Sequence, residues 1–484
     1  MPKRSNPTNT TAITTRGDAA ATLQRLTQQG LAEHLAARLA PRLRHVSEHG
    51  TWLTWTDRGW EPDPYLTSTT AMFTDTLRSI GAEGQDQTDL VARRKLKGFL
   101  EKHETKANID AVLTLMARQK ALATPAAALD ADPDLLGTAN ATIDLRSGRR
   151  RTPRTEDLIT ARVDIAYDAR ATCPRWQRFL AETISEDADA LTYLQQLVGY
   201  TLTGHTSVQQ MWLLTGEGSN GKSTFLNTLM HLGGTNATAA ADSVLLKSDG
   251  NRGANNDIAA LAGKRLVALS ETDRGRYLNE ARLKQLISGD PVAARKLFKE
   301  FGVFSPVAKY FLATNHLPSV RGTDNGIWRR LVVIPFPHRF DGDPNLPDEL
   351  RRELPGILAW AVKGAKAWYA NGRKLTPPEV FAQPTRDYRE GQDNYGRFLA
   401  ECTVPDADAR TPAAALRTTY ETWCQDQGST PLTPNEVGAR LGARGFVSER
   451  YGKNRNAHWR GLRLAREGER TGAQLTLRGA DEAA

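Results

Sequence analysis

The stretch that decides the fold reads Gly216-Glu217-Gly218-Ser219-Asn220-Gly221-Lys222-Ser223-Thr224. The apolar run Met211-Trp212-Leu213-Leu214 precedes it, and residues 225–232 continue with apolar side chains at helical spacing. Glycines at these positions allow backbone N–H groups to crowd around phosphate oxygens, and the following helix directs its positive end at them. Placed between a strand and a helix, the stretch predicts a phosphate-binding loop.

Two side chains of this loop have predicted roles. Lys222 is expected to reach the β- and γ-phosphates of a nucleotide, and the Ser223 hydroxyl to hold Mg²⁺. The other expected nucleotide contacts are Gly216, Glu217, Gly218, Ser219, Asn220, Gly221 and Thr224. The alternative is a glycine-rich turn that binds nothing, which the flanking strand and helix disfavour.

Bulk composition narrows the class of protein. The 484 residues suffice for roughly two to four domains, and 39% hydrophobic with 25% charged residues is ordinary for a globular protein. The three cysteines, at positions 173, 402 and 424, form no Cys-x-x-Cys pair, so neither a zinc site nor a disulfide framework is expected. No apolar run approaches the roughly 20 residues that span a bilayer. We expect a soluble cytoplasmic protein without a membrane partner.

The net charge of +9 favours a polyanionic partner such as nucleic acid. Much of the excess is arginine in an alanine-rich sequence, as high-GC coding would also produce. The charge therefore supports DNA as a partner without establishing it.

A carboxylate follows the next apolar strand pattern. Leu266-Val267-Ala268-Leu269 leads into Ser270-Glu271-Thr272-Asp273. At the end of a parallel strand beside the loop, Glu271 would orient and deprotonate the attacking water and hold Mg²⁺ through a water molecule. The alternative is an acidic N-cap, for which Asp273 is the better candidate.

Polar residues also mark the two following strand patterns. Asn315 ends Tyr310-Phe311-Leu312-Ala313-Thr314 and could hydrogen-bond the γ-phosphate or the lytic water; the alternative is an Asx turn before proline. Arg329 and Arg330 follow Trp328 and precede another strand. Paired arginines there suit a finger inserted into a neighbouring subunit's site, with Arg330 or Arg329 contacting the phosphates.

A basic segment lies between the carboxylate and the asparagine. Residues 284–304 contain the turn signal Ser288-Gly289-Asp290-Pro291 and then Arg295, Lys296 and Lys299 interleaved with phenylalanines. A hairpin of this composition can contact a phosphate backbone and one or two bases. A solvated surface hairpin is the alternative.

Alternating strand and helix patterns predict an α/β fold with a parallel sheet and flanking helices over residues 173–374. Residues 1–20 suggest a flexible basic tail, 21–172 a mixed, mainly helical N-terminal domain, and 375–393, with Thr376-Pro377-Pro378, a linker. Residues 89–122 and 394–427 are expected to be helical. In residues 394–484, a helix start at Thr433, Gly445 and two short strands predict a winged helix.

In this order, the motifs resemble those of superfamily-3 helicases, a branch of the AAA+ ATPases, and more closely the helicase part of the phage and plasmid primase-helicase family related to the poxvirus protein. The resemblance covers roughly residues 40–470. Besides the motifs above, it includes Leu197-Val198-Gly199-Tyr200, Gly263-Lys264-Arg265, Lys284 and the segment of residues 140–148.

The resemblance implies a hexameric ring that hydrolyses ATP and moves 3′ to 5′ along one DNA strand, with residues 295–299 in the pore. It implies replication of a phage, plasmid or integrated element in a bacterial host, with a separate primase or origin-binding protein as a possible partner. Two departures stand out. Ser270 occupies a place where relatives often carry an acid, and no zinc-binding cysteines or convincing carboxylate set suggest primase activity in this chain.

Two other functions remain open from the sequence. The winged helix would also suit a DNA-binding ATPase that melts or marks an origin, or regulates replication, without processive unwinding. An assembly protein that uses ATP only to hold a ring together is disfavoured by Glu271 and Arg330.

Overall fold

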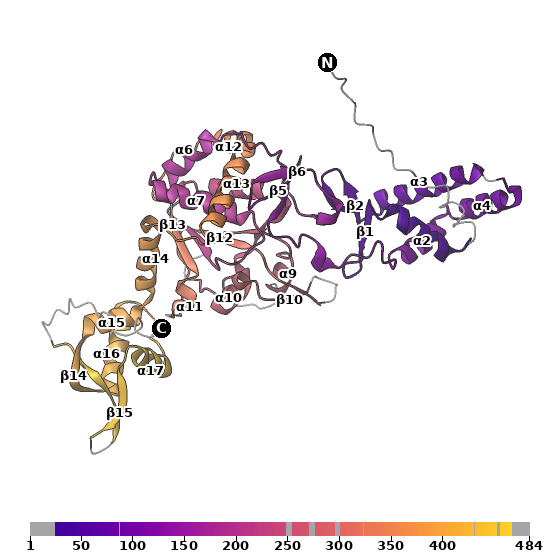
Figure 1. Cartoon of the computed structure of the whole chain (residues 1–484). Helices are drawn as coiled ribbons and strands as arrows, with labels where there is room; N and C mark the ends of the chain where they lie inside the picture. Colours follow the sequence, from indigo (N-terminus) through magenta and orange to yellow (C-terminus); the bar gives the residue numbers. More distant parts are fainter. Residues whose placement is uncertain are drawn as a thin grey trace.

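Three lobes lie in a row along the chain (Figure 1). The computed structural model describes residues 25–86, 88–247, 254–270, 276–295, 301–322, 324–429, 431–452 and 455–466. The N-terminal lobe is mainly helical, the central lobe contains the largest sheet, and helix α14 (Glu379–Gln392) connects it to the C-terminal lobe.

In its described residues, the N-terminal lobe packs four helices beside a small antiparallel sheet. Its elements are α2 (Gln28–Leu39), β1 (Leu43–Val46), β2 (Thr51–Thr56), β3 (Gly59–Pro62), α3 (Thr67–Glu83), α4 (Leu90–Lys102) and α5 (Lys106–Met116). The helical stretch expected over residues 89–122 is confirmed, but as two helices, because the chain turns after Lys102. The turn lets Leu96 of α4 and Val112 of α5 enter one apolar core with Phe73, and the expected mainly helical character of this region is confirmed.

A second small sheet joins this lobe to the central one. It contains β4 (Leu135–Gly137), β5 (Thr142–Asp144) and β6 (Arg149–Arg151), paired antiparallel, as the strand and turn pattern of residues 140–148 predicts. Ile143 and Val163 belong to the same buried cluster as Trp176. The core of the central lobe therefore includes residues before position 173, where the sequence placed the domain boundary.

The central sheet has five parallel strands in the order β13-β7-β12-β9-β8. They are β7 (Met211–Thr215), β8 (Ala237–Ala240), β9 (Leu266–Ser270), β12 (Lys309–Thr314) and β13 (Leu331–Pro335). Alternate residues enter two different cores: Trp212 and Leu214 pack in one, and Leu213 in the other, because successive strand side chains point to opposite faces. The predicted parallel sheet is confirmed.

Helices cover both faces of this sheet. Residues of α6 (Pro174–Thr183), α7 (Ala188–Thr201), α8 (Lys222–Gly233), α12 (Leu346–Arg352) and α13 (Leu354–Ala370) share the core of Trp212. Residues of α9 (Ala254–Ala259), α10 (Glu280–Ser288) and α11 (Asn325–Trp328) share the core of Leu213. The flanking helices predicted from the sequence are thus present on the two faces.

Helices α7 and α13 cross with their backbones in contact. A Cβ atom on Gly364 would overlap the carbonyl oxygen of Gln195, and one on Gly199 would overlap the backbone of Ala365. Glycine at these two positions is what permits the close approach. This crossing fixes α13, which follows the sheet, against α7, which precedes it.

The segment expected to be a linker, residues 375–393, contains helix α14. Pro378 caps the helix start, so Thr376-Pro377-Pro378 marks the entry to a helix. The Val333 N–H of β13 donates to Thr385 Oγ1 of α14 at 2.9 Å, and the Tyr388 ring packs against Trp328 with ring centroids 5.1 Å apart. The segment is packed along the edge of the central sheet.

The C-terminal lobe, over the part that the structure describes, combines three helices with one small sheet. Its elements are α15 (Asn394–Cys402), β14 (Thr403–Pro412), α16 (Ala413–Asp426), α17 (Pro434–Ala443), β15 (Val447–Tyr451) and β16 (Asn456–Leu464), and the strand order is β14-β16-β15. The helix expected over residues 394–427 is interrupted by β14, which pairs with β16, from Thr403 opposite Leu464 to Pro412 opposite His458. The predicted helix start at Thr433 is confirmed as a capping box with Glu436.

Candidate active site

The loop of residues 216–221 leaves the carboxyl end of β7 and leads directly into α8. A Cβ atom on Gly216 would overlap the carbonyl oxygen of Phe336, so only glycine fits there. Asn220 Nδ2 donates to the same Phe336 oxygen at 3.3 Å, and the Phe340 N–H donates to the Ser219 carbonyl at 2.8 Å. The segment after β13 therefore holds the loop in place.

Lys222, the first residue of α8, points its amino group back into the loop. Its Nζ donates to Gly216 O at 2.5 Å, Asn220 Oδ1 at 3.1 Å and Asn315 Oδ1 at 3.1 Å. The residue is 7% exposed, burial lowers the pKa of its ammonium group, and no carboxylate of the described residues pairs with it. An anion at the start of α8 would supply the countercharge that these neutral oxygens lack.

Asn315 meets this lysine from the neighbouring strand. It directly follows β12, whose Thr314 lies in register with Thr215 of β7. The turn after β12 is formed by Thr314, whose Oγ1 accepts from the His316 N–H at 3.0 Å. The amide of Asn315 is turned toward Lys222 instead, so the Asx turn considered from the sequence is not what the structure forms.

The candidate carboxylate belongs to the third strand of this edge. Ser270 ends β9 and pairs with Ala313 of β12, so β7, β12 and β9 present their carboxyl ends side by side. Glu271 and Asp273 lie outside the described residues. The structure therefore shows where β9 ends, directly before Glu271, but it does not describe the side chains of Glu271 and Asp273.

Arg329 and Arg330 lie at the opposite edge of the sheet. The Arg330 carbonyl oxygen accepts from the N–H of Met211, the first residue of β7, at 2.8 Å. The loop follows the last residue of that five-residue strand, about 16 Å away at the usual rise per residue. The arginine pair and the loop of one chain therefore face different edges.

The two arginines differ in their surroundings. Arg329 is exposed, and its Nη2 donates to Gln209 Oε1 at 3.3 Å. Arg330 is half-buried, its Nη1 donates to the Gly326 carbonyl, and its buried Nε has no partner among the described residues. Burial first, and the neighbouring Arg329 second, lower the pKa of Arg330.

The predicted basic hairpin is present between α10 and β12. Strands β10 (Val292–Arg295) and β11 (Phe301–Phe304) pair antiparallel, with Arg295 opposite Phe301. Arg295 ends β10, whereas Lys296 and Lys299 lie outside the described residues. The hairpin itself is confirmed, and the structure describes the strands that lead to and from its basic tip.

Ser223 is the described residue best placed to bind a metal ion beside the loop. Its side chain is exposed in the first turn of α8, next to Lys222, and its hydroxyl has no hydrogen-bond partner among the residues that the structure describes. No group of three or more His, Cys, Asp or Glu side chains suited to a metal ion occurs in the described ranges. One hydroxyl with water and phosphate oxygens fits Mg²⁺, which usually keeps several waters and few protein ligands.

Two buried basic residues, Arg265 and Lys309, lie at the amino edge of the sheet. From the sequence, Arg265 is identified only as part of a motif, and Lys309 is not identified. Arg265 Nη1 donates to Leu202 O at 2.6 Å, and Lys309 Nζ donates to the carbonyls of Thr203 and of Val307, the latter at 3.1 Å. They hold the segment before β7 and serve the fold. A charged residue before an apolar strand gives no signal of this role.

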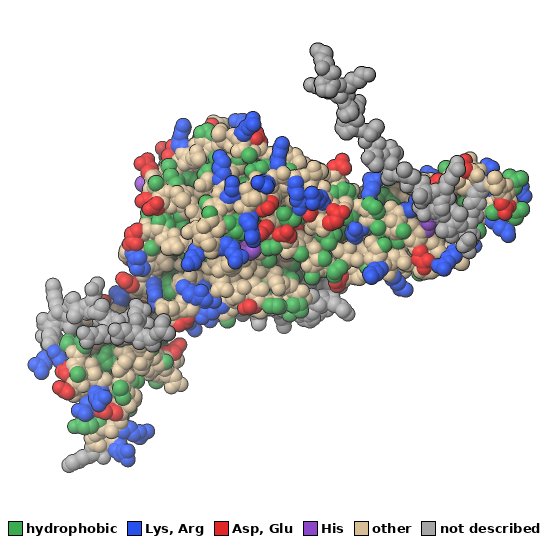
Figure 2. Space-filling view, in the orientation of Figure 1, with side chains coloured by type: hydrophobic (Ala, Val, Ile, Leu, Met, Phe, Trp, Pro, Cys, Tyr) green, Lys and Arg blue, Asp and Glu red, His purple; other side chains and the backbone are tan. Residues whose placement is uncertain are grey.

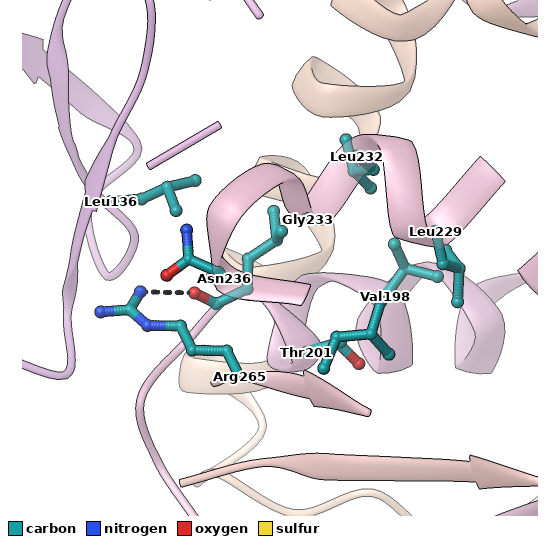
Figure 3. Close-up of a pocket in the computed structure, with 10 residues that line it drawn as sticks. Leu136, Val198, Thr201, Leu229, Leu232, Gly233, Asn236 and Arg265 are labelled. Carbon is teal, nitrogen blue, oxygen red and sulfur yellow. Dashed lines mark hydrogen bonds between the residues drawn. The ribbon is translucent and has the colours of Figure 1, made fainter. Parts of the chain in front are cut away.

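Figure 3 shows a small cavity beside Arg265, lined by Leu136, Val198 and Asn236. Its volume of about 10 Å³ accommodates roughly one water molecule, which could satisfy the unpaired amide of Asn236. It is too small for a nucleotide. A larger groove of about 90 Å³ lies between α8 and α12 and begins at Thr224, the last residue of the loop stretch.

Comparisons with known proteins agree with these motifs. Residues 32–185 match the D5 N-terminal-like family, and residues 214–330 match a family of unknown function, DUF5906. A predicted helicase of Acanthamoeba polyphaga mimivirus is 27% identical over 301 residues, which cover 57% of this chain and 31% of that protein. In the described part of this chain, no helix is long and apolar enough to cross a membrane.

Other relatives also come from large DNA viruses. A predicted helicase of frog virus 3 is 24% identical, covering 51% of this chain and 27% of that protein. A predicted primase of African swine fever virus is 23% identical, covering 61% of this chain and 34% of that protein. The chain thus spans about a third of the length of the curated relatives it matches.

The fold also has a solved counterpart. The apo structure of the NrS-1 C-terminal region superposes with a TM-score of 0.50 at 11% identity, covering 87% of this chain and 96% of that one. At this identity the match concerns the fold alone. The D5-type domain and the viral relatives named as helicases or primases together support this chain as a member of a primase-helicase family.

Proposed function

We propose that the chain is an ATP-dependent DNA helicase of the superfamily-3, AAA+ type, in which residues 216–224 form the P-loop. The observation that carries the proposal is the 3.1 Å contact between Lys222 Nζ and Asn315 Oδ1. It joins the cation of a glycine-rich loop to a polar group on the adjacent parallel strand. Ligands of open parallel sheets bind at this carboxyl edge, and the helix start of α8 favours phosphate.

The chemistry follows from the positions of these side chains. Lys222 neutralises phosphate charge, the loop N–H groups orient the β-phosphate, and Asn315 hydrogen-bonds the γ-phosphate or the attacking water. Glu271, after β9, orients and deprotonates that water. Ser223 would hold Mg²⁺, which neutralises charge on the β- and γ-phosphates when bound.

A ring of identical subunits, which we take to be a hexamer, accounts for the arginine pair. Because Arg330 sits at the amino edge of β7, it faces away from the loop of its own chain. A neighbouring subunit could place its Arg330 or Arg329 against the γ-phosphate, where an arginine stabilises transition-state charge. The active site would then be shared by two subunits.

The β10–β11 hairpin would couple hydrolysis to DNA. Along the chain, the hairpin follows α10 and precedes β12. Together with α10 it therefore connects β9, which ends before Glu271, to β12, which ends before Asn315. Movement of these strand ends during turnover would move the hairpin, with Arg295, Lys296 and Lys299 contacting phosphates of a single strand. We propose 3′ to 5′ movement and a role in replicating a phage, plasmid or integrated element in bacterial cytoplasm, with a separate primase supplying primers.

A strand-displacement assay tests this function. The purified chain is incubated with ATP, Mg²⁺ and forked duplexes that carry a labelled strand and a 3′ tail, a 5′ tail or both. We expect ATP-dependent release of the labelled strand from substrates with a 3′ tail. An ATPase-active preparation that displaces no strand with any tail would reject the helicase proposal.

The C-terminal lobe favours a second candidate function. Its order of helix, strand, helix, helix and two strands supports the winged helix predicted from the sequence, a module that binds duplex DNA in many regulators. The chain could then be an ATPase that melts or marks an origin without processive unwinding. ATP hydrolysis stimulated by DNA, without strand displacement, would favour this candidate.

A further inference from the structure

The helix of the C-terminal lobe that would enter a DNA groove has its arginines engaged elsewhere. Arg440 Nη1 pairs with Asp393 Oδ1 at 3.2 Å, and its Nη2 donates to the Arg321 carbonyl at 2.9 Å. Arg444, the C-cap of α17, pairs with Asp393 Oδ2 at 2.5 Å. The exposed positions of α17 are Pro434, Asn435, Glu436, Ala439, Gly442 and Ala443. That surface offers no cation to a phosphate.

The hairpin formed by β15 and β16, here called the C-terminal hairpin, has the opposite character. Arg450, Arg455 and Arg460 are exposed, and none of the three forms an ion pair with another described residue. The single acidic side chain of the described hairpin, Glu449, is bound by Arg410 Nε at 2.6 Å. Figure 2 shows Lys and Arg side chains gathered at the free end of this lobe. The hairpin therefore presents uncompensated positive charge.

These arginines occupy both faces of the hairpin. In the strand register, Val447 lies opposite Arg460 and Arg450 opposite Ala457, so Arg460 and Arg450 point to different faces. The Arg460 face also carries Tyr451, which is 53% exposed. Strand β16 also pairs along its other edge with β14, where Arg410 lies opposite Arg460, so the hairpin is the outer part of a three-stranded sheet that exposes arginines on both faces.

We infer that the C-terminal hairpin, and not α17, is the surface with which this lobe binds duplex DNA. Exposed guanidinium groups without an acidic partner are suited to contact the backbone phosphates of duplex DNA. Arg450, Arg455 and Arg460 would each contact a backbone phosphate, with Arg455 near the turn of the hairpin. Contacts of this kind position a protein on DNA without reading its sequence, so the binding is largely independent of sequence.

Binding through these guanidinium groups depends steeply on salt. Each phosphate contact made by an arginine releases condensed counterions and adds about 0.9 to the slope of log affinity against log salt concentration on duplex DNA. Removing Arg450 and Arg460 together should therefore reduce the magnitude of that slope by about two.

The test compares matched variants of the full chain on a fluorescent duplex of about 30 base pairs without nucleotide, by anisotropy over a salt series. The first variant is Arg450→Ala with Arg460→Ala. The charge-matched control is Arg373→Ala with Lys374→Ala, in the exposed turn after α13, where neither side chain has an ion pair with a described residue. The third is Ala439→Glu, which adds a negative charge to the exposed side of α17.

We expect the hairpin variant to bind roughly tenfold or more weakly at moderate salt with the reduced slope, and the two other variants to bind like the unmodified chain. Circular dichroism and basal ATPase activity should be unchanged in all three, which separates this inference from the proposed motor function. Unchanged duplex binding by the folded hairpin variant would overturn the inference. So would an equal loss caused by Ala439→Glu, or a hairpin-dependent preference for a single strand of the same length.

Discussion

Lys222 and Asn315, which are 93 positions apart in the sequence, share a hydrogen bond of 3.1 Å at the carboxyl edge of the central sheet. The bond exists because β7 and β12 are parallel neighbours in register, so their ends meet. Through this bond, the lysine of the loop and the asparagine after the adjacent strand lie where one phosphate group could contact both.

Replacing Asn315 by alanine should slow ATP hydrolysis more than it weakens ATP binding. The amide would contact the γ-phosphate or the attacking water only when the substrate is in place, and removal of one such group costs on the order of a hundredfold in kcat. Steady-state ATPase assays would measure kcat and KM. Asn371→Ala, in the exposed turn after α13, is the matched control, and a change confined to KM would contradict the assigned role.

Substitution of Lys222 by alanine should abolish ATP binding. The variant removes the buried cation that the phosphates would meet, and with it the bonds to Gly216, Asn220 and Asn315. Fluorescence titration with a labelled ATP analogue would measure the loss, with a melting curve to confirm folding. Lys374→Ala should bind ATP normally; retention of full affinity by a folded Lys222→Ala protein would count against the P-loop assignment.

Substitution of Arg330 by alanine should leave ATP binding intact and reduce hydrolysis by about a thousandfold. Arg329→Ala tests which member of the pair acts. Because the arginine pair and the loop lie at opposite edges of the sheet, the pair should act on a neighbouring subunit. Mixing inactive Lys222→Ala subunits with inactive Arg330→Ala subunits should then restore part of the ATPase activity. Some interfaces of the mixed ring would combine Lys222 of an Arg330→Ala subunit with Arg330 of a Lys222→Ala subunit, and these interfaces would contain both residues. No recovery from subunits that demonstrably co-assemble would argue that the pair does not act between subunits.

ATP affinity should begin to fall at a lower pH than it would if Lys222 had the pKa of an exposed lysine. Burial lowers the pKa of Lys222 in the free protein, and bound phosphate would raise it again. Affinity is therefore full below the pKa of the free protein and decreases as pH rises through the interval up to the pKa of the bound state. Binding titrations from about pH 7 to pH 10 would show the decline. Lys222→Arg, which stays charged, should give a flatter profile; a flat profile for the unmodified chain would contradict the prediction.

Two glycine-to-alanine changes, one at the crossing of α7 and α13 and one on exposed α4, should have opposite effects on stability. Gly364→Ala forces a methyl group into the backbone of α7 and should destabilise the central lobe by about 3 kcal/mol or more. Gly98→Ala, on the exposed side of α4 with no neighbouring atom within 4 Å, should stabilise by about 0.5–1 kcal/mol. Thermal unfolding of both variants would measure the shifts, and similar melting of the two would contradict the packing described.

The elements of the central lobe could be predicted from the sequence because each carries its own signal. Apolar runs such as that of β12 and the periodic pattern of α10 are local, and their alternation predicts a parallel sheet. The order of the strands is not local. It is decided by packing, which is why the contact between Lys222 and Asn315 could be expected in kind but not in geometry.

Other features gave no local signal at all. Strand β14 was predicted as helix because its partner, β16, lies far along the chain. The hydrogen bond from Asn220 to the Phe336 carbonyl joins residues 116 positions apart. The ion pairs of Arg440 and Arg444 with Asp393 likewise depend on the fold. Patterns in a single sequence report residue type and local spacing. These contacts join residues that only the fold brings together, so no local pattern predicts them.

The bond between the Val333 N–H and Thr385 Oγ1 also has a bearing on association of the folded protein. Strand β13 ends the central sheet on one side, and an unprotected outer strand can recruit a strand from another molecule. Helix α14 lies along that strand and occupies one of its free donors. The helix therefore shields the sheet from strand addition, and shortened versions of the protein that lack it would be expected to self-associate through β13.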